Sequence, residues 1–434
     1  MNDSGAHSAD IAWMLLSTAL VLLMTPALAF FYGGLVRSKN ALNTMMMSFA
    51  ALGPVAVAWA LLGYSLAFAP GNPAIGSFSF AGLRGVGLEA QGAIPHLLFM
   101  MFQGTFAIIT PALISGAVVE RMRFHAYLAF ITLWVLLVYA PVAHWVWGGG
   151  FLASMGALDF AGGAVVHVNA AAAALVAALV IGPRKDYGRH AILPHNVPFT
   201  MLGAGLLWFG WFGFNAGSAL SAGTTATLAF ANTLLAPAAA LAAWTLIDLL
   251  RGGTVTAVGA ATAIVVGLVV VTPAAGYVGP LSAIVMGAIG AMPSYFALIY
   301  RAKTKLDDSL DVVAAHGLGG ATGAILTGIF ADAAWSGGAN GLLAGHPGQL
   351  ATQIASVVIV LAYSGFATFV ILKALALVMP LRISVRDEKL GLDVSDHGEE
   401  AYTHGDGAIL VKPKAALTRT TADVMAAVEP GAGT

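Results

Sequence analysis

The chain of 434 residues has no cysteine and very little charge. Without cysteine there are no disulfide bonds, thiolate metal sites or cysteine nucleophiles. Only 9% of the residues are charged, against about 25% in ordinary soluble domains, so a soluble globule of this size could not cover its surface. The formal net charge of −1 gives no electrostatic basis for a nucleic-acid partner. The scarcity of charge therefore indicates a membrane protein.

Hydrophobic residues make up 59% of the chain and gather in eleven long apolar stretches. A helix needs about 20 residues to cross the roughly 30 Å hydrocarbon layer of a lipid bilayer. We therefore predict an all-α integral membrane fold in which residues 1–380 form one membrane domain and 381–434 a polar tail. The predicted transmembrane helices are 11–36, 43–69, 94–119, 124–141, 162–181, 197–214, 225–249, 255–271, 279–300, 312–330 and 350–380.

The basic residues predict which side of the membrane each end faces, because Lys and Arg in short loops resist translocation. Loops after odd-numbered stretches hold eleven of the nineteen basic residues and the tail holds six, whereas loops after even-numbered stretches hold Arg84 alone. The pattern predicts an outer N-terminus and a cytoplasmic C-terminus, which requires an odd number of spans. We expect a multi-pass protein of the cell membrane, inner or plasma.

Two histidines lie inside apolar stretches, each eight residues after an aspartate. His167 follows Asp159 in the fifth stretch, and His316 follows Asp308 in the tenth. Five spans separate them, so the two halves must run in opposite directions, as in inverted repeats whose substrate path lies at the repeat interface. We therefore predict an inverted five-helix repeat followed by a long eleventh helix. Ionisable groups within a membrane are costly and usually functional.

The chemistry open to such a pair is proton sharing. One imidazole can donate while the other accepts, and an unperturbed pKa near 6.5 suits proton exchange near neutrality. The alternatives are two structural histidines bonded to their neighbours, or the axial ligands of a haem.

Aromatic residues recur at helical spacing in the third and sixth stretches. Such stripes usually pack against other helices. Aromatic faces beside a hydroxyl also hold a small cation through cation–π attraction, worth about 0.5–2 kcal/mol per contact. Trp147, next to a glycine triplet, and the scarcity of charge favour this second interpretation. The stripes are Phe99, Phe102 and Phe106 in the third stretch, and Trp208, Trp211, Phe214 and Ser218 in the sixth.

Asp159 lies at the outer start of the fifth stretch. An aspartate there is a good helix N-cap, because it accepts backbone N–H bonds and complements the helix dipole. A direct role in attracting cations is the alternative.

The sequence resembles the ammonium transporters of the Amt/Rh superfamily, and the Amt branch more than the Rh branch, from about Ala12 to Tyr402. Two of the matching stretches are Asp-Phe-Ala-Gly-Gly-Ala-Val-Val-His at 159–167 and Gly-Trp-Phe-Gly-Phe-Asn-Ala-Gly-Ser at 210–218. The others are 31–40, 102–110, 147–150, 271–278 and 311–317.

The resemblance implies a transporter of ammonium and methylammonium, not an enzyme, that works as a homotrimer without a cofactor. It assigns an outer recruitment site, a gate, twin pore histidines and an aspartate that such transporters need. Residues 391–402 resemble the tail through which these transporters respond to PII signal-transduction proteins. Residues 403–434 match no family pattern. The implied roles are recruitment for Phe102, Phe106, Trp147 and Ser218, gating for Phe106 and Phe214, proton relay for His167 and His316, a structural or cation-attracting role for Asp159, and support for Trp211, Asn215 and Thr272.

The resulting hypothesis is that ammonium gives up a proton at the aromatic site and crosses an apolar pore as ammonia. One alternative is an ammonium sensor that signals through its cytoplasmic tail, although 54 residues leave little room for a signalling domain. A generic solute channel would need more polar pore-facing groups than these stretches offer.

Overall fold

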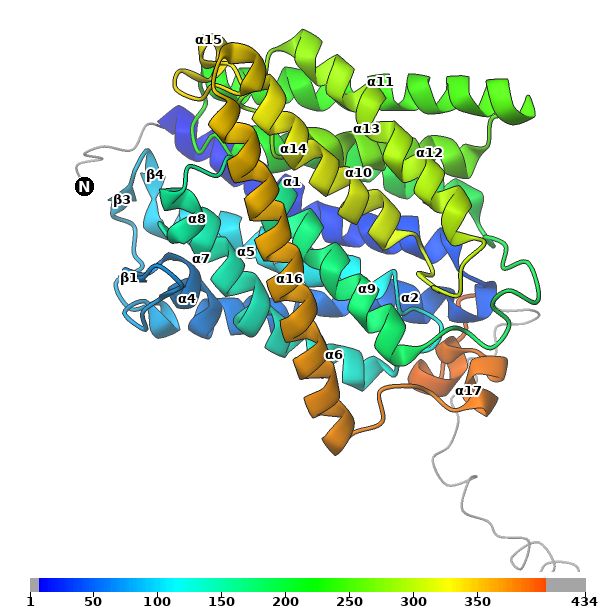
Figure 1. The fold of residues 1–434 in the computed structure, drawn as a ribbon. Helices are drawn as coiled ribbons and strands as arrows, with labels where there is room; N and C mark the ends of the chain where they lie inside the picture. Colours follow the sequence, from blue (N-terminus) through cyan, green and yellow to red (C-terminus); the bar gives the residue numbers. More distant parts are fainter. Residues whose placement is uncertain (1–7, 403–434) are drawn as a thin grey trace, which may run out of the picture.

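The computed structural model describes residues 8–402 as a bundle of helices that run along one another (Figure 1). Ten of the helical spans in this part of the chain are long and apolar enough to cross a membrane. Six of these spans are formed by single α-helices: α1 (Ser8–Leu35), α5 (His96–Ser115), α10 (Val197–Gly217), α11 (Thr224–Gly252), α13 (Pro280–Arg301) and α16 (Pro347–Val378).

The other four spans are built from consecutive segments, and each contains a wider π-helical turn, within the span in two of them and at its start in the other two. The second span joins η1 (Ser38–Asn40), α2 (Ala41–Ala51), α3 (Pro54–Ala58), η2 (Trp59–Gly63) and α4 (Tyr64–Phe68). The fourth joins α6 (Phe124–Trp134), η4 (Val135–Tyr139), α7 (Ala140–Val146) and, after a short break, α8 (Phe151–Ser154). The last two join η5 (Gly163–Val168) to α9 (Asn169–Ile181), and η6 (Val313–Leu318) to α14 (Gly319–Phe330).

The predicted all-helical membrane fold is confirmed, although several helices differ from the prediction in length, and two of these differences have a physical reason or consequence. The fourth helix does not end at residue 141 but continues to Val146, because the wide turn η4 precedes Pro141 and places this proline at the start of α7, where its missing N–H is tolerated. The eighth predicted helix, 255–271, corresponds to α12 (Ala257–Val271), which has only 15 residues and is not among the ten long spans. At 1.5 Å per residue it spans about 22 Å, less than the hydrocarbon layer.

Short elements outside the long helices cover the two ends of the bundle. The loop between α4 and α5 holds the two-stranded antiparallel pairs β1 (Gly71–Asn72) with β2 (Ile75–Gly76) and β3 (Ala90–Gln91) with β4 (Ile94–Pro95). The remaining short helices are η3 (Ala81–Leu83), α15 (Ala333–Ser336), η7 (Leu342–Ala344), α17 (Val385–Leu390) and η8 (Asp393–His397).

The start of α1 and the last described residues lie at opposite ends of the bundle (Figure 1). Asp10 accepts a hydrogen bond from the backbone of Ala222 at one end, whereas Lys39 donates to the carbonyl oxygens of Glu388 and Lys389 at the other. The described chain therefore begins and ends on opposite sides of the bundle, as an odd number of membrane crossings requires.

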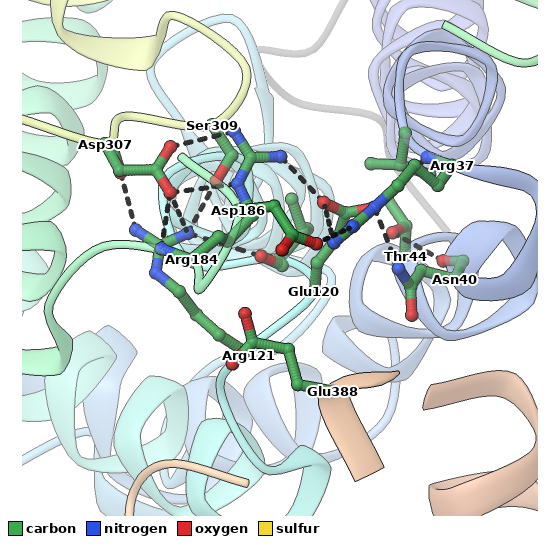
Figure 2. Close-up of polar contacts among 12 residues, drawn as sticks. Arg37, Asn40, Thr44, Glu120, Arg121, Arg184, Asp186, Asp307, Ser309 and Glu388 are labelled. Atoms are coloured by element: carbon green, nitrogen blue, oxygen red, sulfur yellow. Dashed lines mark hydrogen bonds and ion pairs between the residues drawn. The ribbon is translucent and has the colours of Figure 1, made fainter. Parts of the chain in front are cut away.

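A buried ion network joins the loops at the end that carries α17 (Figure 2). Glu120 is completely buried, and its carboxylate pairs with Arg37 at 3.0 Å and with Arg184 at 2.7 Å. Arg184 also pairs with Asp307 at 2.8 Å, and Arg121 lies 3.9 Å from Asp307. These residues follow α1, α5, α9 and α13, so the network fastens four loops to one another.

The described part of the tail is attached to this network. Asn40 donates to Glu120 and accepts a hydrogen bond from the backbone of Leu392 at 2.9 Å. Asp393 accepts from the backbone N–H groups of Leu42 and Asn43, at the start of α2. Residues 381–402 therefore pack against the membrane domain, while the predicted tail beyond them, 403–434, lies outside the described residues.

Candidate functional site

The two intramembrane histidines meet in the middle of the bundle. The Nδ1 atoms of His167 and His316 are 3.2 Å apart, and the rings lie 5.2 Å apart at 25°. Both side chains are buried, with 1% and 4% exposure, and the Nε2 atom of His167 has no hydrogen-bond partner among the described residues. One ring donates and the other accepts, so the pair can hold a single shared proton.

The segments that carry the histidines run antiparallel. Gly317 lies against Ala171, whereas Gly320, three residues later, lies against His167 and Gly163. The second segment therefore advances while the residues it faces on the first segment go back. Both histidines belong to π-helical turns, η5 and η6, that lead into α9 and α14. This is the geometry that an inverted repeat requires.

An aspartate binds the first backbone groups of each of these turns. The Asp159 carboxylate accepts from the N–H groups of residues 162–165, at 2.6–3.0 Å. Asp308 accepts from the N–H of Val313 at 2.7 Å. The carboxylates thus satisfy donors that a helix start leaves free, and they orient the turns on which the histidines lie.

Two stacked phenylalanine rings cover the histidine pair. Phe106 and Phe214 have ring centroids 4.3 Å apart at 35°, and Phe214 stacks on His167 at 6.0 Å. The space beside the two imidazoles measures only about 10 Å³, which is about one water-sized sphere. Apart from the histidines and Trp211, its lining consists of aliphatic side chains, methionine and phenylalanine.

A cavity of about 280 Å³ lies on the other side of Phe106. Phe106, Trp147 and Ser218 line it together, and no charged side chain of residues 8–402 does. The hydroxyl of Ser218 donates to the carbonyl of Phe214 at 2.8 Å, which leaves its oxygen lone pairs available. Phe102 does not line the cavity but packs edge-on against Phe106 at 5.0 Å.

The remaining candidate residues support the aromatic side chains. The indole of Trp211 donates to Thr272 at 2.9 Å, and Asn215 donates to Thr233 at 2.9 Å, so Asn215 ties α10 to α11. Trp147 donates to the carbonyl of Asp159 at 2.8 Å, which links the cavity to the cap of η5.

Sequence reasoning missed several residues of the cavity wall. Phe68, Gln103 and Phe160 line the cavity, but they come from three different elements and share no periodic pattern. Gln103 directly follows Phe102 in a stripe that was recognised by its aromatic spacing, so only its polarity within an apolar stretch could have drawn attention to it.

The geometry of the histidine pair argues against haem ligation. Axial ligands lie on opposite sides of an iron atom, about 4 Å apart if each metal–nitrogen bond is about 2 Å. The 3.2 Å contact leaves no room for a metal in a haem plane between the rings. Within residues 8–402, no group of three or more His, Asp or Glu side chains is arranged to hold a metal ion.

Comparisons with known proteins agree with this architecture. Residues 12–402 match the model of the Ammonium Transporter Family. The chain is 49% identical to an ammonium transporter of Bacillus subtilis over 91% of this chain and 98% of the relative, and 50% identical to one of Aquifex aeolicus over 92% and 95%. Its fold superposes on Saccharomyces cerevisiae Mep2 with a TM-score of 0.86 and 35% identity, covering 94% of each chain.

Proposed function

The chain belongs to the ammonium transporter family, and from this premise we propose that it binds ammonium in the outer aromatic cavity, removes a proton and conducts ammonia past His167 and His316. It is a multi-pass membrane transporter of ammonium and not an enzyme. The observation that carries the proposed mechanism is the 3.2 Å contact between two buried imidazoles beneath the Phe106–Phe214 stack.

The outer cavity suits a small cation. Ring faces of Phe106 and Trp147 attract positive charge, and the Ser218 oxygen accepts a hydrogen bond from a bound ammonium ion. Because no charged side chain lines the cavity, binding is weak enough for the ion to move on.

The apolar space below the gate selects against ions that keep their charge. Moving a bare ion from water into a medium of low dielectric constant costs of order 20 kcal/mol in the idealised Born limit. Potassium must meet this cost in full. Ammonium avoids it by losing a proton, and the neutral ammonia then passes aliphatic and aromatic side chains.

The proton follows a different route in this proposal. The Nε2 atom of His167 has no partner among the described residues, so it is free to take a proton. The contact between the Nδ1 atoms then links this ring to His316. If the proton crosses with ammonia, transport carries net charge.

Asp159 supports the site in two ways. Its carboxylate is bound by four backbone N–H groups, which favours a structural role at the start of η5. Asp159 is only 6% exposed and bonds Trp147 through its backbone carbonyl, so its negative charge lies near the outer cavity. This charge favours the presence of a cation there.

Transport by His167→Ala and His316→Ala tests the mechanism. Purified protein in liposomes should give a current with ammonium and none with potassium, and the two variants should lose this selectivity. Uptake of labelled methylammonium measures flux in the same vesicles. Equal currents for both ions in the wild type, or unchanged selective currents in both variants, would contradict the proposal.

Assembly and regulation are proposed on the same family membership. We expect a homotrimer with one pore per subunit, which the mass of the detergent-solubilised protein would test. A PII protein is the proposed partner of 391–402, which pack on the loop after α1. A variant that ends at residue 402 should keep ammonium flux if transport is the main function, whereas a sensor would lose its output.

A further inference from the structure

One face of α16 is hydrogen-bonded to the segments that carry both histidines, although this helix belongs to neither half of the repeat. Its buried residues recur at steps of three and four and so share one face. On this face, Gln349 donates to the carbonyl of Gly156 at 2.9 Å and Ser364 donates to that of Asn169 at 2.8 Å.

Gln353 is the most fully bonded residue of this face. Its Nε2 atom donates to the carbonyl oxygens of Leu158 at 2.7 Å and Ala324 at 3.1 Å. Its Oε1 atom accepts from the backbone N–H of Leu158 at 2.7 Å and from Gln349 at 3.3 Å. A side-chain amide offers two N–H donors and two lone pairs, so every position is used, and the side chain is only 1% exposed.

The two backbone segments that Gln353 joins belong to opposite halves of the pore. Leu158 directly precedes Asp159, which caps the turn of His167 and accepts the indole N–H of Trp147. Ala324 lies in α14, two turns after His316. One buried amide thus connects the support of the outer cavity to the helix of the second histidine.

We infer that Gln353 is a positioning residue for transport, which holds the segment leading to Asp159 against α14 and so keeps Trp147 and the histidine pair in register. The inference rests on the function proposed above. Removing this amide leaves the partly buried N–H and C=O of Leu158 without their partner, and such groups are costly to leave unbonded where water has little access. The segment must then shift, and Trp147 shifts with it.

The variant Gln353→Met tests this role, because methionine has the same chain length without hydrogen-bonding groups of comparable strength. We expect the KM for methylammonium uptake to rise roughly fivefold, the effect of about one net hydrogen bond. The matched control is Ile354→Met on the neighbouring, 44% exposed position, which should leave KM unchanged. The maximal rate is divided by the amount of folded protein in the vesicles, and a KM equal to the wild-type value would overturn the inference.

A second measurement does not depend on transport. Hydrogen exchange of the backbone amides of 156–165 should be at least several-fold faster in Gln353→Met than in Ile354→Met. Equal exchange rates would contradict the positioning role of Gln353. If Gln353→Met does not assemble, Gln349→Met decides, since it removes one of the four bonds and the bond to Gly156. It should shift KM and exchange in the same direction by less, and unchanged values would overturn the inference.

Trp147→Leu separates the two hypotheses. If this variant raises KM while Gln353→Met does not, the outer site stands and the positioning role fails. If Trp147→Leu also leaves KM unchanged, the proposed outer site itself is wrong.

Discussion

The histidine pair and the ion network of Glu120 are both buried, yet their polar groups are satisfied to very different degrees. In the network, every arginine and carboxylate has an opposite charge within 4 Å (Figure 2). The arginines are Arg37, Arg121 and Arg184, and the carboxylates are the buried Glu120 and Asp307 and, at the edge, the half-exposed Asp186. Within the part of the chain that the structure describes, the histidines have one polar contact, to each other, and nonpolar neighbours elsewhere. The network can only hold its loops together, whereas the histidines keep the freedom to exchange a proton.

This contrast extends to the electrostatics of the network. Burial alone would raise the pKa of the Glu120 and Asp307 carboxyl groups, but the arginines outweigh it. Arg184 and Arg37 lower the pKa of Glu120 to about 2, and Arg184 holds that of Asp307 below its usual range. These carboxylates therefore stay ionised at any physiological pH, and their charges are structural.

The largest effect in this comparison is expected from Glu120→Gln. It leaves Arg37 and Arg184 without their shared carboxylate, and breaking a buried ion pair from one side costs about 3–5 kcal/mol. We expect a clear drop in the thermal unfolding temperature of the detergent-solubilised protein. The control is Asp186→Asn, whose side chain is 46% exposed and which should cost less than about 1 kcal/mol. Similar drops in unfolding temperature for the two variants would mean that buried and exposed ion pairs of the network stabilise the protein equally.

An intermediate effect is expected from acid. A carboxyl group whose pKa is lowered by folding stabilises the protein above its unfolded pKa, and this contribution is lost as the pH falls through the folded pKa. For Glu120 the window runs from 4.5 down to about 2. The unfolding temperature of the wild type should fall across this window, and Glu120→Gln should lack that part of the decline. Parallel pH profiles for the two proteins would show that other groups are responsible.

The smallest effect on stability is expected from the histidines. Replacing both His167 and His316 with leucine removes one hydrogen bond between neutral rings, worth about 1 kcal/mol, and keeps the space filled with apolar atoms. We expect an unfolding temperature close to that of the wild type, together with loss of ammonium selectivity in the liposome assay. A large loss of stability would assign the pair a structural role.

Much of the fold could be predicted from composition alone, because a bilayer requires long apolar helices and most of the chain consists of apolar stretches of that length. The contact between His167 and His316 was also predictable, since inverted halves bring matched positions together. The wide turns η2, η4, η5 and η6 were not, because a π-helical turn differs from an α-helical one by a single residue and leaves no periodic signal. This is why the continuation from Pro141 to Val146 was missed.

Contacts between distant loops were equally hidden. Arg37, Arg121 and Arg184 were read only as markers of the cytoplasmic side, and the sequence does not say that they share carboxylates from other loops. Gln353 was passed over because glutamines at the start of a long apolar helix do not indicate which backbone segments they will bond.

The π-helical turns that carry the histidines set the direction in which each ring points. An α-helix turns by about 100° per residue, so deletion of one residue from η5 would restore regular winding and swing the imidazole of His167 away from His316. The proximity of the rings is therefore a property of backbone winding as much as of residue identity. A related chain that retains both histidines but winds regularly at either turn would possess the two bases without possessing the pair.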